Sequence, residues 1–160
     1  MIKHIKCDIF ESGADVICHQ VNCQGVMGSG IAKQVREKYP KVYEEYAKLC
    51  YEYHNNTKAL LGRVQYVSTW GDGKGNFGGI VNLFAQDRFG YDGKCYTNYY
   101  SLRKCLEEVR RHVYNGKSVA IPYLMGCHRG GGDWNVVYKM IEEVFTDSDC
   151  DVLICEYNGG

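Results

Sequence analysis

The sequence predicts an α/β protein of three layers, in which helices cover both faces of a mixed, mostly parallel, six-stranded sheet. Strand-like and helix-like apolar patterns alternate over most of the chain, which is typical of a sheet covered by helices. A turn-rich stretch at 71–76 joins two strand-like segments as in a hairpin, so the sheet is expected to be mixed. Glycine-rich loops at 22–30 and 126–132 each lie between a predicted strand and a predicted helix.

The predicted elements of the N-terminal part are strands at 1–6 and 16–21 and helices at 31–39 and 42–53. The first strand is mildly apolar and runs into a turn at 7–10. Both helices are predicted from apolar residues that recur every three or four positions. Pro40 separates them, because proline has no N–H group and interrupts a helix.

The predicted elements of the C-terminal part are strands at 63–70, 79–84, 118–121 and 151–157 and helices at 99–113 and 137–145. The stretch 86–98 has no apolar period and is predicted to be a loop. Pro122 ends the strand before the second glycine loop, and Asp133 is placed to cap the helix that follows. No linker, repeat or low-complexity segment divides the chain, so we expect one domain over residues 1–160.

Composition excludes some classes of partner. The chain is 45% hydrophobic and has zero formal net charge, from 19 basic and 19 acidic residues. This balance argues against a bulk electrostatic partner such as duplex DNA or an anionic membrane. The nine cysteines form no C-x-x-C pair, and several lie within apolar patterns (Cys18, Cys105 and Cys155). With no signal peptide and no membrane-length apolar run, we expect a reduced, cytoplasmic protein.

The first glycine loop is predicted to present bare backbone N–H groups at the start of a helix. Such an end carries a partial positive charge and unpaired donors, which suit a phosphate. The spacing of Gly25, Gly28 and Gly30 is neither the dinucleotide-binding pattern nor a P-loop, so the loop alone is a weak signal. Because the loop at 126–132 also follows a strand and precedes a helix, the two loops could hold a diphosphate from both sides.

Six segments carry a resemblance to a known family: 6–10, 19–32, Tyr39-Pro40, Leu61-Gly62, 82–84 and 122–134. On these segments the chain resembles, over essentially its whole length, the macrodomains, whose members bind ADP-ribose. It is most similar to the branch of the ADP-ribose 1''-phosphate phosphatases, and it also resembles glycohydrolases that remove ADP-ribose from glutamate or from DNA bases. This resemblance implies a macrodomain fold and an ADP-ribose site without a cofactor or metal.

The resemblance also implies roles for single residues. Asp8 would accept a hydrogen bond from the adenine amino group, with Ile9 beside it, and Asn22 would hold the distal ribose. Phe89 and Tyr157 would flank the distal ribose and the adenine. The backbone amides expected to line the diphosphate belong to Gly28, Ser29, Gly30, Ile31, Gly130 and Gly131, and the other expected contacts are Gln86, Gly126, Cys127, His128 and Arg129.

Three departures from the family pattern bear on activity. The glycohydrolases use a lysine where this chain has Gln86 and Asp87, which argues against that mechanism. Cys7 replaces the glycine that usually precedes the aspartate at the adenine. His128 and Arg129 replace a small or apolar pair in the second loop, where they would either grip a terminal phosphate or block the distal ribose. The arginine is the better candidate for a phosphate, because it can form two parallel hydrogen bonds to it.

The catalytic candidates are Asp87, His19 and Asn22. Asp87 would act as general base on a water that attacks phosphorus, unless it is only a solvated loop carboxylate. His19 would protonate a leaving oxygen or orient a water, unless it is a hydrogen-bonded core residue. Asp8 has a structural alternative as the cap of a turn. Cys23 and Cys127 are expected to be packed thiols, and the five histidines show no metal-ligand spacing.

These patterns and the resemblance together favour a metal-independent phosphatase that converts ADP-ribose 1''-phosphate to ADP-ribose and phosphate. Two alternatives remain open. One is an ADP-ribosyl glycohydrolase that acts on modified macromolecules. The other is a module without chemistry that binds ADP-ribose or another nucleotide derived from NAD. The expected partner is ADP-ribose or its 1''-phosphate, and the glycohydrolase alternative adds ADP-ribosylated macromolecules.

Overall fold

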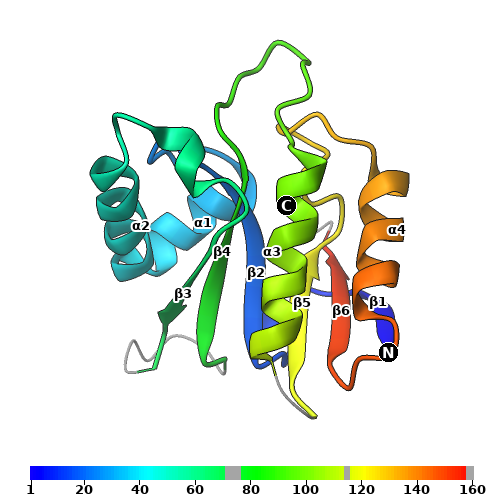
Figure 1. The fold of residues 1–160 in the computed structure, drawn as a ribbon. Coiled ribbons are helices and arrows are strands. Elements are labelled where there is room, and N and C mark those ends of the chain that lie inside the picture. Colours follow the sequence, from blue (N-terminus) through cyan, green and yellow to red (C-terminus); the bar gives the residue numbers. More distant parts are fainter. Residues whose placement is uncertain (71–76, 114–115, 158–160) are drawn as a thin grey trace.

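The computed structural model describes residues 1–70, 77–113 and 116–157, so the predicted turn at 71–76 lies outside the described residues. Within them, six strands form one sheet in the order β1-β6-β5-β2-β4-β3 (Figure 1). The strands are β1 (Ile2–Lys6), β2 (Val16–Asn22), β3 (Val64–Ser68), β4 (Gly79–Gln86), β5 (Ser118–Pro122) and β6 (Asp151–Glu156). Only β3 is antiparallel to its neighbour, as the hairpin pattern predicted. The predicted mixed, mostly parallel sheet is confirmed.

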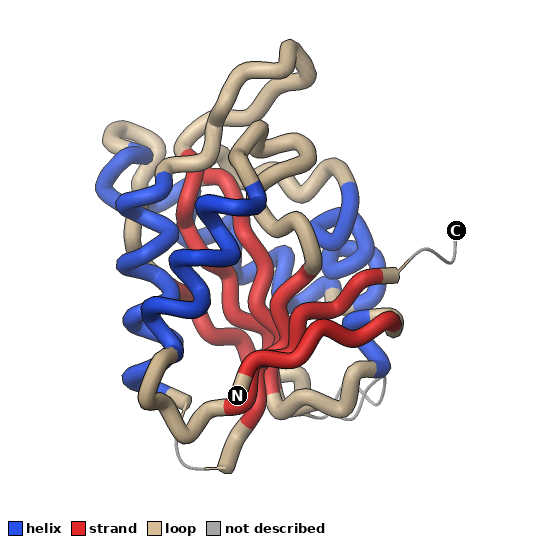
Figure 2. Tube along the Cα trace, turned by 90° about the vertical axis from the view of Figure 1, so that its right-hand side faces the viewer, coloured by secondary structure: helices blue, strands red, loops and turns tan. Residues whose placement is uncertain are grey.

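The helices are α1 (Gly30–Lys38), α2 (Pro40–Glu52), α3 (Tyr99–His112) and α4 (Trp134–Phe145). They lie on both sides of the sheet, which gives the three predicted layers (Figures 1 and 2). Pro40 is the first residue of α2, where its missing N–H removes no helical bond. Two short 3-10 helices, Ile9–Glu11 and Thr57–Leu60, were not predicted. No helix among the described residues is long and apolar enough to cross a membrane.

The core has two halves, one on each face of the sheet. Side chains of a strand alternate between its faces, so Ile17 of β2 packs with α1 and α2 while Cys18 packs with α3 and α4. All eight residues of β4 are buried, as expected for a strand covered on both faces. The nine cysteines are free: Cys95 is exposed, two are half-buried (Cys7 and Cys127), and six are buried. Burial raises the pKa of Cys105 to about 12, so this thiol packs as a small hydrophobe.

The two central strands separate at one end of the sheet. The printed pairs between β2 and β5 are Val16–Val119 and Ile17–Ala120, at the start of each strand. The chain leaves β2 toward α1 on one face and leaves β5 toward α4 on the other face. Parallel neighbours whose connections go to opposite faces form a topological switch point, where α/β proteins place their ligands. Both predicted glycine loops begin there.

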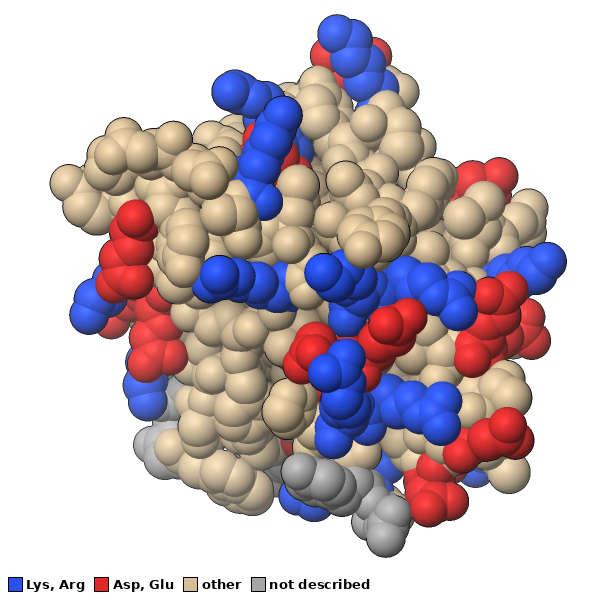
Figure 3. Space-filling model, in the orientation of Figure 1, with Lys and Arg blue, Asp and Glu red and all other residues tan. Residues whose placement is uncertain are grey.

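Charged side chains of both signs intermix on the face that carries α3 and α4 (Figure 3). Arg103 Nη1 lies 2.8 Å from Glu143 Oε2 and thereby links these two helices. This face therefore has no extended field of one sign, in keeping with the balanced composition.

Candidate functional site

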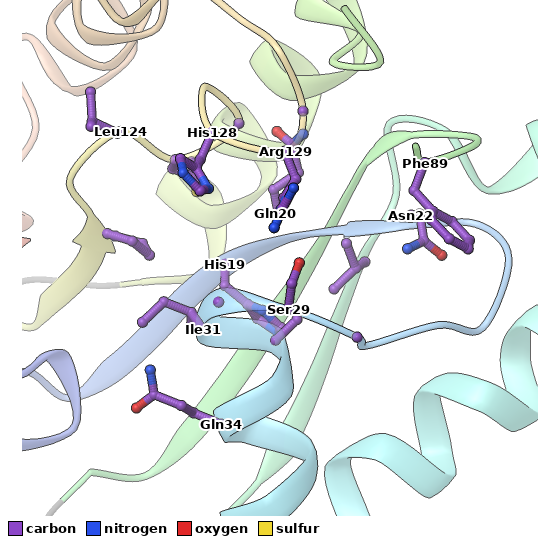
Figure 4. A pocket seen from close by; sticks show the side chains of 18 of the residues that line it. His19, Gln20, Asn22, Ser29, Ile31, Gln34, Phe89, Leu124, His128 and Arg129 are labelled. Atoms are coloured by element: carbon purple, nitrogen blue, oxygen red, sulfur yellow. The ribbon is translucent and has the colours of Figure 1, made fainter. Parts of the chain in front are cut away.

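A cavity of about 530 Å³ opens where β2 and β5 separate, between the two glycine loops (Figure 4). Its volume falls in the range of small-molecule sites. Fifteen of the predicted site residues line it: Asp8, Ile9, His19, Asn22, Gly28, Ser29, Gly30, Ile31, Gln86, Phe89, Gly126, His128, Arg129, Gly130 and Tyr157. The sequence therefore identified most of the cavity wall, although the two loops are about a hundred residues apart in the chain.

Asp87, the predicted general base, is not among the residues that line the cavity. Its Oδ1 accepts hydrogen bonds from Thr57 Oγ1 at 2.7 Å and from Gln24 Nε2 at 3.1 Å. The cause is an irregularity in β4: Val21 pairs with Phe84, but Asn22 pairs with Gln86, so Ala85 is skipped. Such a bulge reverses which face the following side chains point to. Gln86 thus joins the cavity and Asp87 turns away, which corrects the prediction.

Cys127 and Gly131 were also predicted to contact the ligand and are not among the lining residues. The Cys127 thiol lies 3.4 Å from the Met125 carbonyl oxygen and packs against the α3–α4 half of the core. Gly131 has a φ of +69°, and a Cβ there would lie 2.3 Å from the carbonyl oxygen of Lys94. The Gly131 backbone therefore packs closely against the 86–98 segment rather than lining the cavity. This close approach leaves no room for a side chain at position 131.

Asn22 lines the cavity, but its amide also organises the first glycine loop. Its Oδ1 accepts from the Gln24 backbone N–H at 2.9 Å, and its Nδ2 donates to the Val26 carbonyl at 2.8 Å. These two bonds fold the chain back on itself directly after β2. The loop is thereby held by its own polar residue before any ligand arrives.

The first turn of α1 faces the cavity, and no N-cap side chain bonds to its backbone N–H groups. Ser29 is the N-cap residue and forms no side-chain cap bond, whereas Asn98 and Asp133 cap α3 and α4 with their side chains. The cap predicted for Asp133 is confirmed. Because Gly30 and Ile31 line the cavity, their end of α1 offers helix N-terminal N–H groups to a ligand.

The second glycine loop is braced by residues 94–97, a segment for which the sequence predicted no role. Thr97 donates its hydroxyl to the Gly126 carbonyl at 2.6 Å. The Gly130 carbonyl accepts from the backbone N–H groups of Tyr96 at 2.7 Å and Thr97 at 3.0 Å. The groups that donate to these two carbonyls thus belong to residues that do not line the cavity. Thr97 is buried, which fixes the loop to the protein body.

Among the described residues that line the cavity, the acidic ones are Asp8 and Glu156 and the arginine is Arg129. Asp8 lines the cavity, as predicted. Its Oδ1 also accepts a hydrogen bond from the Phe10 N–H at 3.0 Å, so Asp8 caps the turn as well. Arg129 lies with its guanidinium carbon 4.3 Å from the ring centroid of Tyr91, a lining residue that the sequence analysis missed. None of the described residues that line the cavity is a lysine.

His19 and Gln20 are consecutive in β2, point to opposite faces, and are each bound to an amide of β4. His19 Nε2 lies 2.6 Å from Asn82 Oδ1, and Gln20 Nε2 donates to Gln86 Oε1 at 2.8 Å. Burial lowers the pKa of His19 to about 4, so the imidazole is neutral at pH 7. Gln20 and Asn82 escaped the sequence analysis. An amide residue within an apolar strand pattern could have indicated them, because a buried amide needs a hydrogen-bond partner.

No protein-family model matches the chain. It is 29% identical over 164 aligned residues to a DNA ADP-ribosyl glycohydrolase of Mycobacterium tuberculosis, an alignment that covers all of this chain and 43% of the relative. It is 36% identical over 98 residues to an ADP-ribose 1''-phosphate phosphatase of Scheffersomyces stipitis, with 54% of this chain and 57% of the relative covered. The chain thus spans about half the length of these curated relatives.

Among solved structures, the macrodomain of Mycobacterium tuberculosis DarG superimposes with a TM-score of 0.77 at 26% identity, over 98% of this chain and 97% of that one. The six-stranded, mostly parallel sheet and the four helices match the macrodomain α/β fold. The chain has the macrodomain fold, as its sequence predicted, and its relatives include both enzyme classes that the resemblance named.

Proposed function

We propose that this macrodomain binds ADP-ribose in the cavity between its glycine loops and hydrolyses ADP-ribose 1''-phosphate to ADP-ribose and phosphate. The observation that carries the proposal is the first turn of α1, which opens into the cavity without a side-chain cap and faces the second loop across it. A diphosphate is the part of ADP-ribose that such N–H groups suit. The names of the relatives point to the same nucleotide.

The terminal phosphate is assigned to the Arg129 side of the cavity. Arg129 supplies a cation on the second loop, and His128 lines the cavity beside it. With Asp87 outside the cavity, phosphoryl transfer would rest on positioning and charge stabilisation by backbone N–H groups and Arg129. This proposal needs no metal ion.

The test is to incubate the purified protein with ADP-ribose 1''-phosphate, to follow inorganic phosphate, and to titrate ADP-ribose in a calorimeter. Saturable phosphate release together with ADP-ribose binding supports the proposal. Binding without release from any ADP-ribose ester would replace it by a nucleotide-binding module. If the protein neither binds ADP-ribose nor releases phosphate, the proposed ligand itself is refuted.

A second candidate is an ADP-ribosyl glycohydrolase. It is favoured by the similarity to a DNA ADP-ribosyl glycohydrolase over the whole of this chain, since the phosphatase alignment covers only 54%. The lack of a lysine among the described lining residues weighs against a mechanism of that kind. Release of ADP-ribose from modified DNA or from glutamate-modified protein, without phosphate release from the 1''-phosphate, would establish this candidate instead.

A further inference from the structure

The side chain of His19 ends a line of hydrogen bonds that crosses three strands and reaches α2. Its Nε2 lies 2.6 Å from Asn82 Oδ1 in β4. Asn82 Nδ2 donates to Gln65 Oε1 in β3 at 3.0 Å, and Gln65 Nε2 donates to the backbone carbonyl of Glu45 in α2 at 3.1 Å. His19 and Asn82 are almost wholly buried.

The orientation of each group in this line follows from its last member. The carbonyl of Glu45 can only accept, so Gln65 must present its N–H₂ there and its oxygen to Asn82. Asn82 in turn must present its N–H₂ to Gln65 and its oxygen to His19. An amide oxygen cannot donate, so Nε2 of His19 carries the hydrogen. In the neutral ring, Nδ1 is therefore the acceptor.

The hydrogen bonding of the other ring nitrogen, Nδ1, distinguishes a structural histidine from a functional one. A histidine that only fills the core would have both nitrogens hydrogen-bonded. Nδ1 of His19 is buried, and among the described residues it has no hydrogen-bond partner, although the ring lines the cavity. Figure 4 shows His19 in the same part of the cavity as Ser29 and Ile31, at the start of α1. The His19 ring thus belongs to the same cavity wall as the start of α1.

We infer that Nδ1 of His19 accepts a hydrogen bond from an O–H group in the occupied cavity, and that Asn82 and Gln65 are positioning residues that hold this tautomer. The O–H group is a hydroxyl of the nucleotide or a water held against it. The inference rests on the proposed function for its ligand. It assigns His19 the role of acceptor, because its one N–H is committed to Asn82 and cannot donate to a leaving oxygen.

The first test is the tautomer of His19 in the ligand-free protein, read from nitrogen-15 NMR of the imidazole at pH 7. We expect a protonated Nε2 and an unprotonated Nδ1. In a Gln65→Leu variant Asn82 loses its acceptor, and the two tautomers should mix. Gln65→Glu gives up the bond to the Glu45 carbonyl but keeps an acceptor for Asn82, so it should preserve the wild-type spectrum. The opposite tautomer or a doubly protonated ring in the wild-type protein would overturn the inference, whatever the activity.

The second test titrates ADP-ribose into the same sample and compares His19→Gln with the wild type. A glutamine amide can still donate to Asn82, but its acceptor oxygen lies one bond further from the backbone than Nδ1 and does not reproduce that acceptor. If the partner is a nucleotide hydroxyl, the Nδ1 resonance moves on binding and His19→Gln weakens ADP-ribose affinity about tenfold. If the partner is the attacking water, affinity is kept and phosphate release falls about a hundredfold.

These outcomes separate the inference from the proposed function. A protein that binds ADP-ribose with a shifted Nδ1 resonance but releases no phosphate would refute the phosphatase and keep the acceptor role. An unmoved Nδ1 resonance, together with unchanged affinity and unchanged phosphate release in His19→Gln, would refute the acceptor role. An unmoved resonance in a wild-type protein without turnover would refute it as well.

Discussion

The hydroxyl of Tyr46 lies 2.8 Å from Oδ1 of Asn22 and 2.8 Å from its backbone carbonyl oxygen. Tyr46 belongs to α2 and is fully buried. The helix layer thereby holds the point at which β2 passes into the first glycine loop. Because that loop leads directly to the first turn of α1, the position of the N–H groups proposed to bind the diphosphate depends on a tyrosine outside the cavity.

Replacing Tyr46 by phenylalanine should therefore weaken both the fold and the site. The change removes a buried donor and leaves oxygens of Asn22 short of a partner, which should lower the free energy of unfolding by about 1–2 kcal/mol. ADP-ribose affinity should fall severalfold because the loop is less well fixed. Urea unfolding and calorimetry measure the two effects. Tyr51→Phe is the control, since Tyr51 lies in the same helix and is 74% exposed. Equal behaviour of the two variants would contradict this account.

Gly131→Ala should reduce ligand binding although Gly131 does not line the cavity. The new Cβ would meet the Lys94 carbonyl oxygen, so the second loop must move, and the positive φ adds strain. Gly13→Ala carries the same kind of strain at a φ of +80° with no atom within 4 Å of the new Cβ. We expect both variants to lose about 1 kcal/mol of stability from the backbone, and Gly131→Ala alone to lose ADP-ribose affinity. Calorimetry and thermal unfolding of the pair check this, and equal affinities would be the contrary result.

The buried His19 predicts how stability depends on pH. Its pKa is lowered to about 4 in the folded protein from 6.5, so between these values the unfolded chain binds the proton more readily. The free energy of unfolding should be unaffected by this histidine above pH 6.5. It should fall by on the order of 3 kcal/mol as the pH falls toward 4, because the unfolded chain takes up the proton first. Urea unfolding at several pH values measures the slope. His19→Gln should flatten it, whereas His54→Gln, which removes an exposed histidine, should not. A slope that persists in His19→Gln would assign it to other groups.

Arg129 offers a test of the two roles that its sequence position allowed. If the guanidinium binds the terminal phosphate, Arg129→Ala should lower the affinity for ADP-ribose 1''-phosphate about tenfold or more and change ADP-ribose binding little. If it blocks the distal ribose, the same variant should bind ADP-ribose more tightly. Calorimetry with both ligands distinguishes these results. Arg88→Ala is the matched control, because Arg88 is exposed, directly precedes the lining residue Phe89 in the sequence and is not itself among the lining residues.

Local patterns carried most of the prediction. The break at Pro40, the cap at Asp133 and both glycine loops depend on residues adjacent in the chain, whose backbone preferences act without tertiary context. The two loops could also be brought together in advance, because parallel strands end at the same edge of a sheet. The sheet class and the glycine loops of the cavity wall followed from these features, whereas the other predicted lining residues came from the resemblance to macrodomains.

The errors arise where side-chain direction depends on long-range pairing. A period of two would place Asp87 on the face of Gln20, but the skipped Ala85 exchanges the faces of Gln86 and Asp87. Nothing within β4 itself predicts this irregularity, since it appears only in the pairing with β2. The partners of His19 were missed for a related reason. Asn82 and Gln65 become a line of hydrogen bonds only after β2, β4 and β3 are aligned.

The distribution of the nine cysteines has a practical consequence. Cys95 is the exposed one, and it lies beside Tyr96 and Thr97, whose N–H groups bind the Gly130 carbonyl of the second loop. Burial raises the pKa of Cys23 and Cys155 to about 12, which keeps these thiols protonated and slow to alkylate. A maleimide dye should therefore attach first at Cys95 in the native sequence. The protein thus carries its own reporter position behind the second glycine loop, so a movement of this loop on ligand binding can be followed by fluorescence without engineering a label.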